Sequence, residues 1–389
     1  MVVRTVMDDV LERAIAEGRV PGVVALAADR SGVIYQGAFG KRAFGGDADM
    51  TTDTVFWIAS MTKALTSVAA MQEVEQGKLD LDEPIGQRIP ELANPVVLEG
   101  FDASGAPQLR PARRPITLRH LLTHTAGFTY EIWNADMARY ARGNDLPGII
   151  ECKNACLALP LIADPGDRWE YGINIDWAGK AVELASGLSL NVYLRERIFE
   201  PLGMTDTGFV LRSDQRERQA RMHVRTGETS FDVIEFEIPQ APEFYMGGGG
   251  LYSTGPDYLR FLRALLGDGA LDGARILKPE TVAQLGENQI GDLLVTMLKT
   301  VDPVSSNDAE FFPGMPKKWG LAYMISTEQA PTGRSAGSLA WAGLGNTYFW
   351  LDPSRDVTGL ILTQILPFAD AAVLDAFGQF ERAIYDTAA

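Results

Sequence analysis

The sequence predicts an α/β domain whose sheet uses both ends of the chain, with a mainly helical domain inserted between those ends. Segments with strand patterns lie near both termini, and the pattern between them is mainly helical and broken by Pro/Gly-rich loops. In addition, 389 residues with 46% hydrophobic content can bury a large core. We expect a discontinuous α/β domain over 1–59 and 205–389, a mainly helical domain over 60–204, and an active site between them.

The N-terminal part predicts an amphipathic helix followed by a β-hairpin. Two apolar runs, 23–28 and 33–39, have strand character. The residues between them, Asp29-Arg30-Ser31-Gly32, have the composition of a tight turn that ends in glycine. The apolar positions of the preceding helix are Val6, Val10, Leu11 and Ala14.

The inserted part predicts helices separated by loops. Its best helical pattern begins at Ser60 and ends near Gly77, which is a C-cap signal, and a second helix is expected over 176–186. The loops are expected at 83–84, 94–95, 101–115 and 164–167.

The C-terminal part returns to strands. Four glycines at 247–250 fit either a close approach of backbone to a ligand or a flexible connector before a helix that ends at Leu266. The segment 295–318 has little regular pattern and predicts a long surface loop. Strands are expected at 321–326, 338–342, 347–351 and 357–366, and a final helix at 371–385.

The charge and the cysteines exclude several classes. A net charge of −16 and an isoelectric point near 4.7 argue against nucleic acid and anionic membranes as partners, because both need basic patches. Residues 1–20 lack the apolar core of a signal peptide, and no apolar run is long enough to span a membrane, so we expect a cytoplasmic location. The spacing of Cys152 and Cys156 fits neither a redox nor a zinc motif and predicts free thiols.

Ser60-Met61-Thr62-Lys63 is the main candidate for chemistry. Residues three apart share a helix face, so the Ser60 hydroxyl and the Lys63 amine can meet. The apolar run 55–59 leads into the serine, and burial together with the helix dipole favours a neutral lysine that can take the hydroxyl proton. The alternative is a capping serine beside a solvated lysine, because this motif is common by chance.

Two rival sites are weaker. Gly333-Arg334-Ser335-Ala336-Gly337 spells G-x-S-x-G, but a loop precedes it, a strand follows it, and no histidine lies downstream to complete a triad. His120 and His124 have the i, i+4 spacing of zinc helices but lack the glutamate of H-E-x-x-H, so a structural role near a helix end is favoured.

Tyr171 is a candidate third group, because it follows the turn 164–167 and precedes the helical pattern that starts at 176. A phenol close to an ammonium group can ionise below its usual pKa and relay protons. Core packing is the alternative for a single tyrosine among eleven.

Five motifs occur in a recognisable order: Ser60-Met61-Thr62-Lys63, Leu121-Leu122-Thr123-His124-Thr125-Ala126-Gly127, Pro165-Gly166 followed by Tyr171, Pro201-Leu202-Gly203-Met204, and Trp341-Ala342-Gly343. Together they resemble the serine β-lactamase and penicillin-binding-protein-like superfamily, and most of all its carboxylesterases related to class C β-lactamases, the family VIII esterases. The resemblance implies a β-lactamase-like fold, in which terminal helices flank an antiparallel sheet and a large helical domain is inserted. It also implies that Ser60 is the acylated nucleophile, that Lys63 and Tyr171 transfer protons, and that the backbone N–H groups of Ser60 and Leu344 form the oxyanion hole.

Two departures from the superfamily bear on substrate. Trp341-Ala342-Gly343 stands where lactamases and peptidases carry K-T-G or H-T-G, and Ile173 stands where they carry an asparagine. An indole in place of a cation removes a partner for a substrate carboxylate. Substrate contacts are therefore expected from Tyr130, Trp341, Ala342 and Gly343, and neutral esters are favoured.

We therefore predict a serine carboxylesterase that cleaves short- to medium-chain esters without a cofactor or metal. Whether Lys63 or Tyr171 is the base stays open, because the two titrations are coupled. Within the same site the alternatives are an acyltransferase, an amide hydrolase and a β-lactamase, and a non-catalytic scaffold protein is the alternative from another class.

Overall fold

The computed structural model describes residues 2–387 and contains helices and strands in the following order. The α-helices are α1 (Val2–Ala16), α2 (Thr62–Glu75), α3 (Leu118–Leu122), α4 (Ala135–Gly143), α5 (Asn174–Ser186), α6 (Leu190–Leu194), α7 (Glu200–Leu202), α8 (Ser213–Glu217), α9 (Gly255–Leu266), α10 (Pro279–Gly286) and α11 (Ala371–Thr387). The strands are β1 (Gly22–Ala28), β2 (Val33–Gly40), β3 (Phe56–Trp57), β4 (Val96–Phe101), β5 (Pro107–Pro111), β6 (Met222–Arg225), β7 (Phe231–Ile234), β8 (Tyr252–Ser253), β9 (Ala270–Leu271), β10 (Ala274–Arg275), β11 (Lys317–Trp319), β12 (Met324–Ser326), β13 (Leu339–Gly343), β14 (Thr347–Asp352), β15 (Val357–Leu362) and β16 (Ile365–Leu366).

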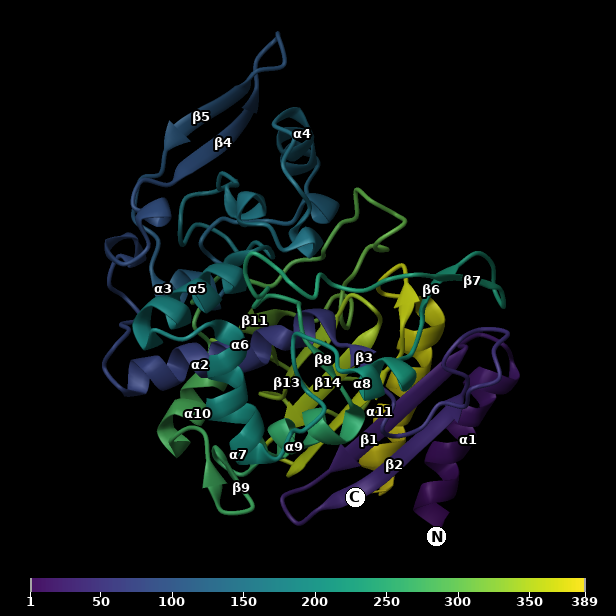
Figure 1. Cartoon of the computed structure of the whole chain (residues 1–389). Helices are drawn as coiled ribbons and strands as arrows, with labels where there is room; N and C mark the ends of the chain where they lie inside the picture. The colour runs from purple at the N-terminus through teal and green to yellow at the C-terminus, as the bar shows by residue number, and fades with distance from the viewer. Residues whose placement is uncertain (1, 388–389) are drawn as a thin grey trace.

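One antiparallel sheet contains strands from both ends of the chain, as the sequence predicts. Its order is β11-β12-β13-β14-β15-β1-β2, and β1 pairs with β15, with Val24 opposite Leu362 (Figure 1). The two N-terminal strands form the predicted hairpin. All seven strands pair with antiparallel neighbours, which confirms the β-lactamase-like fold class.

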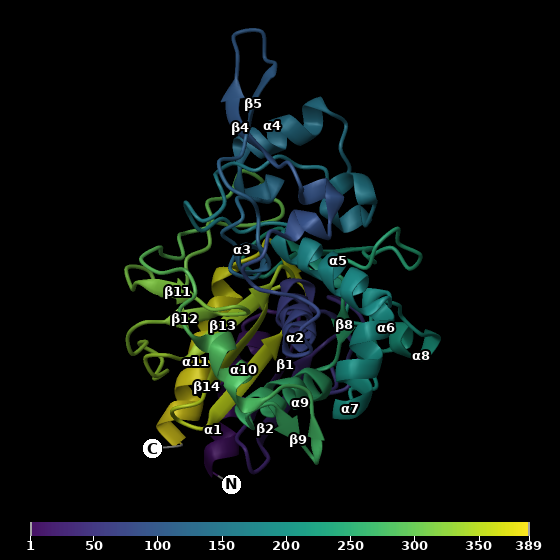
Figure 2. The ribbon, with the colours of Figure 1, turned by 90° about the vertical axis from the view of Figure 1, so that its left-hand side faces the viewer.

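Helices cover both faces of this sheet. Consecutive strand residues point to opposite sides, so neighbouring residues of one strand pack against different helices. On β14, Phe349 packs against Tyr258 of α9 with ring centroids 5.4 Å apart. The next residue, Trp350, packs against Phe380 of α11 at 6.0 Å. The terminal helices α1 and α11 lie together on one face, whereas α9 lies on the other (Figures 1 and 2).

The segment 60–204 is mainly helical, and its helices α2 and α5 pack against each other. The prediction of a loop over 101–115 is wrong, because β4 and β5 form a hairpin there that projects from the helical part (Figure 2). Strand β4 has apolar character, with Val97 and Leu98 buried, but β5 begins and ends with proline and is largely exposed, so the pair lacks the apolar alternation from which a hairpin is recognised.

Other boundaries differ from the predictions. The strand expected over 321–326 is shorter in the structure, where β12 spans only Met324–Ser326. A further strand, β11, begins at Lys317, at the end of the segment 295–318 expected to be a loop. The strand expected over 357–366 is divided into β15 and β16, and β16 leaves the main sheet to pair in parallel with β6. The polar pair Thr363-Gln364 stands at this division, and the buried Gln364 amide bonds to the backbone of Trp57.

Candidate active site

Ser60 lies in a 3₁₀ turn, Ala59–Met61, immediately before α2, rather than within the helix itself. Ala59 has φ of +43°, a left-handed conformation that non-glycine residues seldom adopt. The preceding segment is anchored to the α/β part, because Ile58 N–H donates to Leu251 O at 3.0 Å. The serine is therefore presented at a tight, strained bend between a buried strand and a buried helix.

Lys63 meets Ser60 as the spacing predicts. Its side chain is 2% exposed, and Nζ lies 3.0 Å from Ser60 Oγ. The same nitrogen lies 3.1 Å from the Tyr130 hydroxyl and donates to Gly248 O at 2.6 Å. The alternative of a solvated lysine is excluded by this burial.

Burial lowers the pKa of Lys63 to about 7, and the opposite charge of Asp176 offsets part of that effect. An ammonium group loses its hydration in the interior, so the neutral amine gains relative to the charged form. Near neutral pH a substantial fraction of Lys63 is therefore a free base beside the serine hydroxyl.

Tyr171 lies against the same pair. Lys63 Nζ is 4.7 Å from the centre of its ring, and Trp341 Nε1 donates to its hydroxyl at 2.9 Å. Burial raises the pKa of Tyr171 and outweighs the hydrogen bonds with Ser60 and Trp341, which act in the opposite direction. The expectation that this phenol ionises below its usual pKa is therefore wrong, because desolvation of the phenolate dominates. Tyr171 remains a protonated donor.

A small cavity of about 60 Å³ opens at Ser60. No charged side chain lines it among the described residues, and most of its lining is apolar or glycine backbone. Ser60 and Leu344 line it together, as an oxyanion hole made from their backbone N–H groups requires. The lining residues are Trp57, Ala59, Ser60, Tyr130, Ile132, Trp133, Ile149, Ile150, Met246, Gly248, Gly249 and Leu344.

Three of the four expected substrate contacts do not line this small cavity, and their contact with substrate stays a prediction. Tyr130 lines the cavity, but Trp341, Ala342 and Gly343 are not among its lining residues. Trp341 is 5% exposed and packs edge-on against Trp319, with centroids 4.6 Å apart. Its indole supports Tyr171 from behind, because β13 turns that side chain toward the aromatic interior.

Gly343 permits the close approach of β13 to the serine. A Cβ atom there would lie 2.3 Å from Ile58 O, which is closer than real contacts allow. The absence of a side chain lets β13 pack directly against the Ser60 turn and brings Leu344 to the cavity.

The glycine run 247–250 is a wall of the site, which decides between the two readings of the sequence. Thr66 Oγ1 donates to Gly247 O at 2.8 Å, and Trp57 Nε1 donates to Gly249 O at 2.7 Å. With the contact of Gly248 to Lys63, three consecutive carbonyls are held by buried side chains. The run is a close approach of backbone to the catalytic candidates and is no flexible connector.

The two histidines of the i, i+4 pair serve different local structures, as expected. His120 Nδ1 accepts the Thr117 N–H at the start of α3. His124 is fully buried, and its Nδ1 accepts from the Asn174 amide at 3.0 Å. Among residues 2–387, no three His, Cys, Asp or Glu side chains gather closely enough to hold a metal ion.

The remaining motifs take no part in the Ser60 site. Ser335 lies in a turn followed by β13, and its N–H donates to Asp352 Oδ2 at 2.8 Å, so no nucleophile elbow forms there. Cys152 and Cys156 are free thiols, as predicted. Among the described helices, none combines the length and apolar character needed to cross a bilayer.

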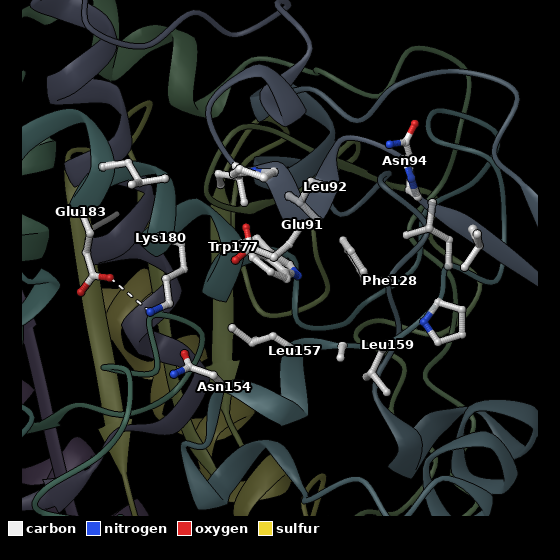
Figure 3. A pocket seen from close by; sticks show the side chains of 18 of the residues that line it. Glu91, Leu92, Asn94, Phe128, Asn154, Leu157, Leu159, Trp177, Lys180 and Glu183 are labelled. Carbon is white, nitrogen blue, oxygen red and sulfur yellow. Dashed lines mark ion pairs between the residues drawn. The ribbon is translucent and has the colours of Figure 1, made fainter.

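A separate, larger cavity of about 1030 Å³ lies in the helical part, beside Phe128, Leu157 and Trp177 (Figure 3). Lys180 and Glu183 form an ion pair at its edge. None of the residues described as lining this cavity also lines the Ser60 cavity. We place the candidate chemistry at the smaller cavity, because the nucleophile, the amine and the phenol meet there.

Asp176 is a residue that the sequence reasoning treated only as the start of a helical pattern. Its side chain is 1% exposed, and its Oδ1 accepts the Gly248 N–H at 2.8 Å. The available signal was an acid between Ile175 and Trp177 on an otherwise apolar stretch, because carboxylates are seldom fully buried without a partner.

Replacing Trp341 by phenylalanine tests its position behind Tyr171. If the site cleaves the esters that the sequence predicts, we expect kcat to fall about 10-fold with little change in KM, because the ring remains and only the N–H to the Tyr171 hydroxyl is lost. Steady-state kinetics with p-nitrophenyl butyrate measure both constants. The matched control is Trp350→Phe, whose indole packs on α11 at the other face of the sheet. A raised KM with unchanged kcat would instead indicate direct contact of Trp341 with substrate.

Comparison with known proteins shows that a family model described as Beta-lactamase matches residues 7–383. Monacolin J acid methylbutanoyltransferase of Aspergillus terreus is 34% identical over 97% of this chain and 95% of its own length. Lovastatin esterase of Penicillium rubens is 33% identical over 97% of this chain and 98% of its own length. The solved structure of unliganded simvastatin synthase from Aspergillus terreus has a TM-score of 0.86 at 31% identity, covering 100% of this chain and 99% of that chain.

Proposed function

Because the chain belongs to the β-lactamase family, we propose that it cleaves carboxylic esters of short acyl chains through an acyl-enzyme on Ser60. The observation that carries this proposal is the fully buried Lys63, whose pKa is lowered to about 7 and whose Nζ lies 3.0 Å from Ser60 Oγ. A serine hydroxyl needs such a base within hydrogen-bond reach to become a nucleophile.

In the proposed acylation, neutral Lys63 accepts the Ser60 proton while Oγ attacks the ester carbonyl carbon. The negative charge develops on the carbonyl oxygen, which the N–H groups of Ser60 and Leu344 would stabilise. When the tetrahedral intermediate collapses, the bond to the alkoxide breaks and the protonated Tyr171 hydroxyl supplies its proton. Lys63 then returns a proton to Tyr171, so the pair ends acylation in its initial state. This order assigns the base to Lys63, because the pKa of Tyr171 is raised.

Deacylation repeats these steps with water in place of serine. Lys63 takes a proton from water as the water oxygen attacks the acyl carbon, and Ser60 leaves with a proton from the same relay. The acid product carries one oxygen from water, so atoms and protons balance.

The lining of the Ser60 cavity supports neutral esters with short acyl groups. Its apolar side chains offer no cation to a substrate carboxylate, and the small space beside Ser60, about 60 Å³, favours short acyl groups. A panel of p-nitrophenyl acetate, butyrate, octanoate and decanoate, with intact-mass detection of the acyl-enzyme, tests the proposal. Turnover greatest at acetate or butyrate is expected. The absence of any acyl adduct on Ser60 with every ester would refute it.

Transfer of the acyl group to an alcohol is a second candidate function. It is supported by the relatives described as a methylbutanoyltransferase and an esterase, which differ in the acceptor of the acyl group and share this chain's family. An apolar lining also lets an alcohol compete with water at the acyl-enzyme. Supplying an acyl thioester with and without alcohol acceptors, and measuring the ratio of new ester to free acid, distinguishes transfer from hydrolysis. A chromogenic cephalosporin tests β-lactam cleavage in the same assay.

The pH dependence of turnover follows from Lys63. Below its pKa of about 7 the amine is protonated and cannot accept the serine proton, so we expect kcat/KM to fall as the pH drops through about 7. The plateau should lie on the alkaline side. A profile for p-nitrophenyl butyrate in constant ionic strength measures the midpoint. A value of kcat/KM that stays on its plateau down to pH about 5 would contradict Lys63 as the base.

A further inference from the structure

We propose that Asp176 is a positioning residue that acts on Lys63 through the backbone of Gly248, and that it both orients the amine and preserves its basicity. This inference rests on the proposed function, in which Lys63 is the base. It explains two features that the reaction itself leaves unassigned, namely a fully buried carboxylate on α5 and the glycine at position 248.

The contacts form a continuous path across one residue, Gly248. Asp176 Oδ1 accepts the Gly248 N–H at 2.8 Å, and Gly248 O accepts from Lys63 Nζ at 2.6 Å. The N–H and the carbonyl of Gly248 belong to successive peptide groups that share its Cα, so a hydrogen bond to each of them limits the rotation of this residue and the direction of its carbonyl. The amine is thereby fixed with Ser60 Oγ at 3.0 Å.

Position 248 must be glycine for this arrangement to exist. A Cβ atom there would lie 2.5 Å from Asp176 Oδ2, too close for any side chain. Oδ2 is itself buried and has no hydrogen-bond partner among the described residues. An unsolvated carboxylate in the interior acts on a neighbouring ammonium more strongly than it would at the surface.

The other titratable groups that face Lys63 are neutral at working pH. Burial raises the pKa of Tyr130 and of Tyr171, which therefore keep their protons. Burial and the nearby Lys63 charge lower the pKa of His124, which therefore stays uncharged. Among the described groups that contact or act on Lys63, Asp176 is left as the source of negative charge.

Burial of the Asp176 carboxylate costs free energy, because the charged group loses its hydration. A residue with only a structural role could avoid this cost. Burial raises its own pKa to about 6, which the charge of Lys63 only partly offsets. Its place in the first turn of α5 favours a carboxylate through the helix dipole, but that benefit is available to a surface acid as well. Only a buried position beside the 247–250 segment lets Asp176 accept the N–H of Gly248, the residue whose carbonyl binds Lys63.

The test separates charge from geometry with two variants. Asp176→Asn keeps an oxygen for the Gly248 N–H and removes the charge, so we expect the pKa of Lys63 to fall by about one, with the acid limb of kcat/KM moving equally to lower pH. Asp176→Ala also removes the acceptor, so kcat should fall at least about 10-fold beyond the asparagine variant. The pKa of Lys63 is read directly by NMR of ¹³Cε-labelled lysine, with its signal assigned by its loss in Lys63→Arg.

Asp257→Asn is the matched control, because Asp257 is also a buried acid in the first turn of a helix, α9, and accepts a backbone N–H from Asp206. It should leave the Lys63 signal and the acid limb in place. An unchanged Lys63 pKa in Asp176→Asn would overturn the inference, whatever the enzyme turns over. Failure of the proposed function gives a different result, in which no ester acylates Ser60 although the NMR shift is present.

Discussion

Replacing Ser60 by alanine is expected to reduce kcat for p-nitrophenyl butyrate by at least about 1,000-fold and to prevent labelling by a fluorophosphonate probe. The reason is that the proposed reaction passes through an ester on Oγ, for which the cavity offers no substitute. The change removes one oxygen at a tight turn and leaves the buried segments on both sides intact, so the variant should fold.

Ser335→Ala is the matched control for this variant. Ser335 belongs to the G-x-S-x-G sequence but lies in a turn before β13, away from Lys63 and Tyr171. Its loss should change kcat by less than about 2-fold. Near-normal turnover by the Ser60 variant, or loss of turnover by the Ser335 variant, would show that the nucleophile has been assigned wrongly.

Replacing Lys63 by methionine is expected to lower kcat about 1,000-fold while retaining the volume of the side chain. Methionine fills the space but cannot accept the Ser60 proton or bond to Gly248 O and Tyr130. Binding of substrate should change less, because the cavity lining does not include Lys63. Steady-state kinetics at the alkaline plateau are the measurement, since protonation of the wild-type lysine does not confuse the comparison there.

The methionine variant should lose activity but gain stability relative to wild type near neutral pH. The pKa of Lys63 is about 7 in the folded protein and about 10.5 in the unfolded chain, so the unfolded chain binds an extra proton between these values. Wild-type stability therefore gains from rising pH across this window, whereas the methionine variant lacks this term. The Tm of the variant relative to wild type should be higher at pH about 7 than at pH about 10.

Thermal unfolding of both proteins at the two pH values measures this difference. Lys63→Arg is an informative comparison, because its charge persists throughout the window and its stability should be low at both pH values. A Tm difference between the methionine variant and wild type that is independent of pH would mean that Lys63 does not have a lowered pKa in the folded state.

The sequence predicted the main sheet because its strands carry strong apolar patterns at both ends of the chain. It predicted the meeting of Ser60 and Lys63 for a local reason, since three residues along a helical path fix their separation. It did not reveal the β4–β5 hairpin, whose second strand is polar and largely exposed, or the departure of β16 from the main sheet after Thr363-Gln364. Patterns of apolar residues report burial, and they say little where a strand is exposed or buried on both faces.

The lining of the Ser60 cavity differs from the expected substrate contacts for a related reason. Trp341 stands at a position that the resemblance connects with substrate, but the direction of its side chain depends on the aromatic residues that pack around it, including Trp319 and Tyr171. The apolar residues that line the cavity include Ile132, from the short 3₁₀ helix Glu131–Trp133, and Met246, from a loop, and neither belongs to a motif. The direction of the pKa shift at Tyr171 was likewise wrong, because the degree of burial is a property of the packed structure.

The sequence by itself determined the fold class, the nucleophile candidate and its amine, because these depend on periodicity and on spacing along a single segment. Only the tertiary structure decided that Lys63 is buried, that Tyr171 keeps its proton, and that Asp176 and the glycine wall stand behind the amine. Those properties arise where α2, α5, β13 and the 247–250 segment converge, and both desolvation and hydrogen bonding there depend on groups far apart in the chain.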